Sequence, residues 1–166
     1  HTRLFAEELT QNFASNHGEK LAKALVDAQV DLNPHQVDAA LFAFQSPLSK
    51  GAILADEVGL GKTIEAGLVL AQRWAERKRR MLVITPANLR KQWFQELTEK
   101  FFLPCEILES KSYNQQWQSG RLEPFISDNI LICSYQFARS RAADIRRIRW
   151  DLVVMDEAHR LRNVYK

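Results

Sequence analysis

Two short segments, about ninety positions apart, hold the residues whose types and spacing could do chemistry. In the first, Gly59 and Gly61 are followed directly by Lys62 and Thr63. Glycines permit the tight turn that brings backbone N–H groups close to phosphate oxygens, a lysine adds a mobile positive charge, and a hydroxyl can bind Mg²⁺. The segment therefore predicts a phosphate-binding loop, although Asp56 stands where the strict pattern has its first glycine.

The loop is expected to bind the nucleotide together with the start of the helix that follows it. The positive amino-terminal end of that helix favours an anion. The expected nucleotide-binding residues are Glu57, Val58, Gly59, Leu60, Gly61, Lys62, Thr63 and Ile64, with Thr63 also binding the metal.

The second segment reads Asp-Glu-Ala-His and follows the apolar run 152–155. Ligand sites of parallel α/β sheets form at the carboxyl ends of strands. Adjacent carboxylates can divide the work there: Asp156 would hold magnesium, largely through water, and Glu157 would position and polarise the attacking water. Two carboxylates after a strand are often simply solvated, but together with residues 56–63 they predict a site for ATP and Mg²⁺.

Composition limits the class of protein. The chain has 166 residues, of which 46% are hydrophobic, so it is one domain or part of one. No apolar run approaches the ~20 residues that span a bilayer, so we expect a soluble protein without a membrane partner. Cys105 and Cys133 are far apart, which suggests neither zinc nor a disulfide and fits the cytoplasm. Cys133 lies in an apolar run and is expected to be a buried thiol.

Basic residues concentrate in two places, although the net charge is only +3. One cluster is 77–80, and the other contains Arg139, Arg141, Arg146, Arg147 and Arg149. Such clusters can contact phosphates, but a solvated helix end or loop is the simpler interpretation of each.

Hydrophobic periodicity predicts a helical amino-terminal extension over residues 1–30 and an α/β domain over 31–166. Asn33 and Pro34 resemble a helix start, with the helix running to about Phe44. Further helices are predicted at 62–78 and 86–101, and 110–128 is the least regular stretch. Strands are predicted at 52–55, 81–85, 106–109, 130–134 and 152–155. This alternation favours a parallel sheet flanked by helices, and strands without polar alternation are typical of a sheet covered on both faces.

Five segments, in order, resemble the first motor lobe of superfamily-two helicase-like ATPases, and within them the Swi/Snf-type translocases on double-stranded DNA. They are 32–36, 54–67, 83–93, 132–135 and 156–163, so the resemblance covers about residues 30–163. It implies a RecA-like lobe of the phosphate-loop NTPase class, ending soon after the Asp-Glu-Ala-His motif. The amino-acid sequence of the loop is particularly similar to that of bacterial members.

The resemblance also implies roles for single residues. Gln36 would read the adenine edge, His159 would couple the nucleotide site to the nucleic acid, and the catalytic set would be Lys62, Asp156, Glu157 and His159. Contacts to the nucleic-acid backbone would come from Thr85, Pro86, Gln92, Ser134 and Tyr135. Trp93 matches the same motif, but its i, i+4 spacing with Leu89 and Leu97 favours a core position.

Family members continue beyond the second ATP motif with a further strand and a second motor lobe. The resemblance therefore implies that this chain alone hydrolyses ATP poorly, because arginines of the second lobe complete the site. It also implies an open sheet edge next to the Asp156 strand, since the further strand normally lies between that strand and the phosphate-loop strand. Exposed edges favour dimerisation or strand borrowing.

Proteins with several other functions contain the same type of motor lobe. The parent could be the helicase subunit of a restriction or defence system, or a factor that recycles RNA polymerase. The isolated chain could also be a nucleotide- or nucleic-acid-binding module without turnover. A phosphate-loop kinase is disfavoured by Gln36, by the Asp-Glu-Ala-His motif and by Thr85-Pro86.

Overall fold

The computed structural model describes residues 34–45, 51–53 and 62–159, which belong to two compact units. Unit 1 holds the described residues up to Arg77 together with Glu99–Phe102, and unit 2 holds Lys78–Thr98 and the residues from Leu103 on. Several predictions lie outside the described residues: the helices within 1–30, the Asn33 cap, the loop residues 57–61, and the end of the motif after His159.

Unit 1 is built on two helices, α3 (Pro34–Gln45) and α4 (Lys62–Ala75), which pack against each other. Val37, Ala40 and Leu41 of α3 are buried and recur at helical spacing on one face of the helix. Helix α4 ends three residues earlier than predicted, because Arg77 adopts a left-handed conformation with φ of 62° that stops the helix.

The predicted strand at 52–55 is wrong in the part that the structure describes. Ala52 and Ile53 form no strand, and Ile53 is 87% exposed; Leu54 and Ala55 lie outside the described residues. An apolar run becomes a strand only when a neighbouring strand supplies ladder partners. Neither Ala52 nor Ile53 takes part in the described sheet.

Gly67 in the middle of α4 is required by a close approach. A Cβ atom there would lie 2.3 Å from Cε2 and 2.5 Å from Cζ of the Phe101 ring, and Phe101 is itself buried. The ring therefore occupies the space that any side chain at this position needs.

Gly67→Ala is expected to destabilise the protein. Alanine is otherwise favoured over glycine inside a helix by about 1 kcal/mol, but overpacking against the ring costs about 1–3 kcal/mol. Urea denaturation measures the change, and Phe101→Leu in the Gly67→Ala background should recover part of it. A Gly67→Ala variant more stable than the wild type would contradict this packing.

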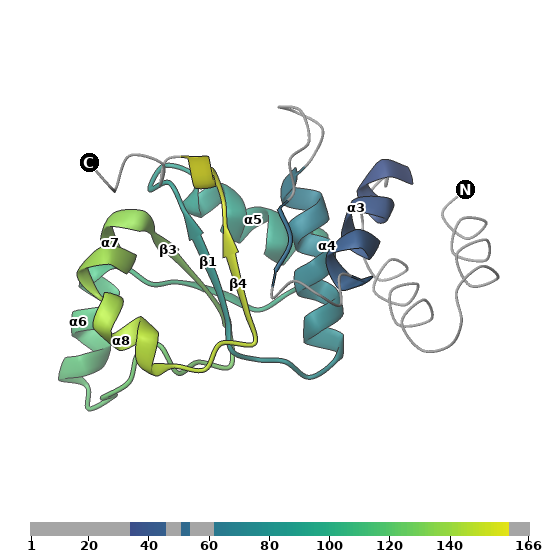
Figure 1. Cartoon of the computed structure of the whole chain (residues 1–166). Coiled ribbons are helices and arrows are strands. Elements are labelled where there is room, and N and C mark those ends of the chain that lie inside the picture. Colours follow the sequence, from purple (N-terminus) through teal and green to yellow (C-terminus); the bar gives the residue numbers. More distant parts are fainter. Residues whose placement is uncertain (1–33, 46–50, 54–61, 160–166) are drawn as a thin grey trace. The chain divides into compact units, whose positions relative to one another are not determined.

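Unit 2 is a parallel sheet with the order β2-β3-β1-β4, which confirms the α/β prediction (Figure 1). The strands are β1 (Met81–Thr85), β2 (Cys105–Ile107), β3 (Ile130–Ser134) and β4 (Leu152–Met155). Every residue of β1 and β3 is buried, as expected for strands covered on both faces.

Strand β4 departs from that expectation. Among the described strands it pairs with β1 alone, and Val153 and Met155 are 37% and 50% exposed. Its side chains alternate between half-buried and exposed because one face is uncovered in the described part of the chain. Within the described residues, β4 therefore forms one edge of the sheet.

Four helices accompany the sheet: α5 (Arg90–Lys100), α6 (Ser110–Gln118), α7 (Tyr135–Ser140) and α8 (Ala142–Arg147). Helix α5 begins four residues later than predicted, because a turn closed by the Leu89 N–H and the Pro86 carbonyl precedes it. Helix α6 was not predicted; a capping box of Glu109 and Ser112 starts it, and Tyr113 is its one buried residue. Figure 1 shows α5 behind the sheet and α7 in front of it.

One face of the sheet packs against an aromatic cluster. Tyr113, Phe125 and Phe137 have ring centroids 5.8–6.0 Å apart and cover Leu82, Ile84, Leu131 and Cys133 of the central strands. Cys133 is fully buried, which confirms that prediction, and both cysteines are free thiols. Burial raises the pKa of each of the two thiols to about 12, so both stay protonated at neutral pH. Among the described residues, no helix is long and apolar enough to cross a membrane.

Candidate nucleotide and metal site

Asp156 follows β4 directly, and its carboxylate is held by two donors from neighbouring elements. Its Oδ2 atom accepts a hydrogen bond from Thr85 Oγ1 at 3.1 Å and another from Trp93 Nε1 at 2.9 Å. Thr85 ends β1, and Trp93 lies in the first turn of α5. Since one oxygen takes both bonds, the carboxylate is fixed in orientation and its other oxygen remains for further ligands.

The backbone of Asp156 is fixed as well. Its N–H donates to the Ile84 carbonyl at 2.9 Å, and its carbonyl accepts from the Tyr135 hydroxyl at 2.6 Å. Tyr135 is the first residue of α7, directly after β3. Residues at the carboxyl ends of β1, β3 and β4 thus all contact Asp156. In α/β sheets, ligands bind at this end of the strands.

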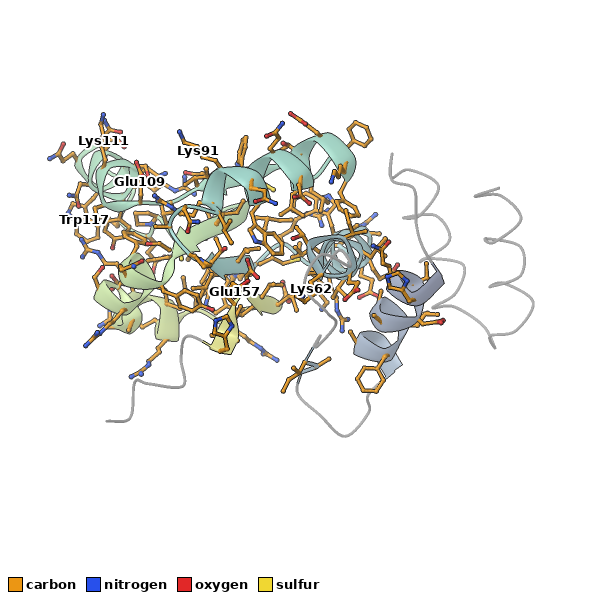
Figure 2. All side chains as sticks on the ribbon, turned by 90° about the horizontal axis from the view of Figure 1, so that it is seen from above. Lys62, Lys91, Glu109, Lys111, Trp117 and Glu157 are labelled. Atoms are coloured by element: carbon orange, nitrogen blue, oxygen red, sulfur yellow. The ribbon has the colours of Figure 1, made fainter. Side chains whose placement is uncertain are left out.

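Glu157 adopts a left-handed conformation, with φ of 54°, in the turn after β4. This conformation is uncommon for a residue with a side chain and concentrates at functional sites. Its Oε2 atom lies 3.2 Å from His159 Nδ1, and the Glu157 side chain is 38% exposed. This partial exposure lets water reach the Glu157 carboxylate, which belongs to unit 2 (Figure 2).

The other half of the predicted site lies in unit 1. Gln36 is buried on α3, and Lys62, Thr63 and Ile64 form the first turn of α4, with Lys62 and Thr63 half-buried. The backbone N–H groups of a first helical turn have no partner within the helix and are suited to bind an anion. The sequence-predicted residues are thus gathered into two sets, Gln36 and 62–64 in unit 1 and 156–159 in unit 2.

The residues expected to contact a nucleic acid differ in their exposure and in their hydrogen-bond partners. Thr85 and Pro86 are buried, and the Thr85 hydroxyl is bonded to Asp156. Ser134 caps α7 by accepting the Phe137 N–H at 3.2 Å. In this structure the Thr85 and Ser134 hydroxyls therefore form hydrogen bonds within the protein, to Asp156 and to the Phe137 N–H. Gln92 is exposed on α5, where its amide donates to Glu96.

Trp93 is buried, at 3% exposure, as its helical spacing predicted. The helical spacing alone did not indicate that the indole N–H of Trp93 positions Asp156. A signal for this role existed, because a buried indole N–H usually finds a hydrogen-bond partner, and Trp93 follows the carboxyl end of β1 closely in sequence.

The Asp156 carboxylate has the chemistry of a magnesium ligand. No cluster of three or more histidine, cysteine, aspartate or glutamate residues that could hold a metal ion occurs in the described part of the chain. Magnesium is usually held by one or two carboxylates together with phosphates and water. Asp156, with one oxygen fixed and one remaining, suits that kind of coordination.

Comparison with known proteins identifies the family of this chain. The SNF2-related domain matches residues 10–165. The chain belongs to the SNF2-related family. The RNA polymerase-associated protein RapA of Serratia proteamaculans is 36% identical over 137 residues, and RapA of Yersinia pseudotuberculosis has the same identity over the same length. The SWI2/SNF2 ATPase core of Sulfolobus solfataricus, solved in complex with double-stranded DNA, superposes with a TM-score of 0.70 at 25% identity.

This SNF2-related chain corresponds to part of each of these proteins. It matches 14% of the length of each RapA and 29% of the Sulfolobus chain, whereas 80% and 84% of this chain are covered. Its parallel sheet with flanking helices is the fold of one portion of an SNF2 ATPase core.

Proposed function

We propose that this chain is the first ATP-binding lobe of an ATP-dependent translocase on double-stranded DNA. The observation that carries the proposal is the immobilised Asp156, held at the carboxyl edge of the sheet by Thr85 and Trp93 with Glu157 beside it. In the parent protein a second lobe would complete the site. The free thiols Cys105 and Cys133 suit the reducing cytoplasm.

The roles of the residues follow from their chemistry. Gln36 would bind adenine, the loop 57–61 and Lys62 would bind the phosphates, and Thr63 and Asp156 would hold Mg²⁺. Magnesium, when bound, would neutralise charge on the β- and γ-phosphates. Glu157 would orient the attacking water and accept its proton, and His159, 3.2 Å from Glu157, would couple that residue to events at the nucleic acid.

Double-stranded DNA is proposed as the track because the Sulfolobus core was solved with it. Pro86 and Tyr135 directly follow β1 and β3, and Gln92 lies in the first turn of α5. These three residues would contact the nucleic-acid backbone or support such contacts, with Thr85 and Ser134 acting through the internal bonds described above. The similarity to RapA favours a second candidate within the same class, a motor that associates with RNA polymerase.

The proposal is tested by calorimetric titration of the chain with magnesium-ADP, in wild type and Lys62→Ala. Removing a charged donor to phosphate costs about 1.5–3 kcal/mol, so the affinity should fall about 10- to 100-fold. Lys111→Ala is the control, because Lys111 is an exposed lysine on α6 outside the proposed site (Figure 2). Equal affinities in wild type and Lys62→Ala would contradict the proposed role of Lys62. A folded wild type that binds no ADP would contradict nucleotide binding by this chain.

A further inference from the structure

Two basic clusters that are about seventy positions apart in sequence meet at the end of the sheet where β1 and β4 begin. The Asp151 carboxylate accepts the backbone N–H groups of Arg79 at 3.2 Å and Arg80 at 3.1 Å. In return, the Asp151 N–H donates to the Arg80 carbonyl at 2.8 Å. These bonds place 78–80, before β1, beside 149–151, before β4. We call Lys78, Arg80, Arg146, Arg147 and Arg149 the basic edge.

The charge of this region dominates the chain. Residues 139–149 contain five arginines and one aspartate, a net +4, and 78–80 with Asp151 add three positive charges and one negative, a net +2. The two together give +6, whereas the whole chain carries +3, so the remainder is −3. A positive field of this kind attracts polyanions from a distance.

The two acidic residues within the region are already engaged. Asp144 accepts the Tyr113 hydroxyl at 3.2 Å, and Asp151 holds the two backbone N–H groups together with a long contact of 3.9 Å to Lys78. Arg146, Arg147 and Arg149 are exposed, and no ion pair involves them within the described residues. Their charge is therefore left for an external anion.

The arginines project from a rigid support. Ile145, Ile148 and Trp150 pack against the aromatic cluster, and the Trp150 indole donates to the Ile145 carbonyl at 3.0 Å. Apolar residues that face inward thus alternate with arginines that face solvent. A support fixed in this way reduces the entropy lost on binding, which favours a contact surface over a flexible solvated loop.

The chemistry of the surface favours nucleic acid over protein. Protein interfaces are built around buried apolar and aromatic anchors, whereas nucleic-acid interfaces are polar and strongly positive. None of the exposed large hydrophobic residues in the described part of the chain falls within 78–80 or 139–151. The planar arginine fork also matches phosphate geometry.

We propose that the basic edge is a second nucleic-acid-binding surface, which holds the phosphate backbone without reading its sequence. It is separate from the nucleotide site, because Asp156 lies at the carboxyl end of β4 and Arg149 precedes its amino end, a strand length of about 13 Å away. This inference rests on the proposed function, to which it adds a second contact on the opposite edge of the sheet.

The test is fluorescence anisotropy of a labelled 30-base-pair DNA duplex titrated with the chain at several salt concentrations. The variant is Arg146→Gln/Arg149→Gln. Each phosphate contact contributes about −0.9 to the slope of log affinity against log salt, so the slope should become shallower by about 2. The control is Lys111→Gln/Arg121→Gln, which removes the same charge from two exposed residues of the same unit and should leave the slope near that of the wild type.

Three results would overturn the inference. One is a variant slope equal to that of the wild type, and a second is an equal loss in variant and control, which would show only a net-charge effect. The third is a wild type that binds polyglutamate but no duplex, which would indicate an acidic protein partner. Magnesium-ADP titration of the same variants separates this inference from the proposed function, because nucleotide binding should stay unchanged in both.

Discussion

Phe137→Ala is expected to lower the free energy of unfolding by about 3–5 kcal/mol, the range for deleting a buried aromatic side chain. Phe137 is buried in α7, and its ring lies 5.9 Å from that of Tyr113 and 6.0 Å from that of Phe125. Removing it would leave a cavity beneath the turn that places Ser134 and Tyr135 at the carboxyl edge. Urea denaturation followed by tryptophan fluorescence measures the change.

Phe94→Ala is the matched control, because Phe94 lies in the same unit but is 37% exposed. It should cost less than about 1 kcal/mol, since partly exposed side chains contribute less burial. Similar losses for Phe94→Ala and Phe137→Ala would show that the aromatic cluster is not the centre of the core.

Asp156 gives the second large effect, and two substitutions separate its structural role from its chemical one. Asp156→Ala removes the oxygen that accepts from both Thr85 and Trp93 and leaves two donors without their acceptor. Each such loss costs about 1–3 kcal/mol, so a total destabilisation of about 2–6 kcal/mol is expected. The alanine variant should also lose the magnesium-dependent part of its ADP affinity.

Asp156→Asn keeps a carbonyl oxygen that can accept both hydrogen bonds but removes the negative charge. It should unfold within about 1 kcal/mol of the wild type, while its ADP affinity should no longer respond to magnesium. Thermal unfolding and calorimetry with and without magnesium measure the two properties. An asparagine variant that still responds fully to magnesium would remove Asp156 from the metal site.

The sequence predicted the parallel α/β sheet well, because β1 and β3 are uninterrupted apolar runs and both are fully buried. It failed where neighbours decide the structure. Ile53 belongs to an equally apolar run, yet the structure places it in no strand and leaves it exposed. Helix α6 was missed for the opposite reason: one buried residue, Tyr113, gives no periodic signal, and a local capping box starts the helix instead.

In the site, too, the sequence predicted what depends on local spacing and not what depends on contacts between distant segments. Motif spacing identified Asp156 and Glu157 as a pair, but no spacing rule shows that a tryptophan on α5 and a threonine on β1 bind the same carboxylate oxygen. Nor could it show that 78–80 and 149–151 are neighbours, since Asp151 joins them only in the folded sheet.

The shared Oδ2 atom of Asp156 has a thermodynamic consequence. Thr85 and Trp93 lie in the segment expected to approach nucleic acid, so a ligand that shifts either of them changes the free energy of the carboxylate proposed to hold magnesium. Linkage makes such an effect reciprocal: the factor by which DNA changes affinity for magnesium-nucleotide equals the factor by which the nucleotide changes affinity for DNA. A tenfold factor corresponds to about 1.4 kcal/mol, comparable to one hydrogen bond to a charged group. The two hydrogen bonds to this one oxygen atom would thus be enough for DNA and magnesium-nucleotide to change each other's affinity.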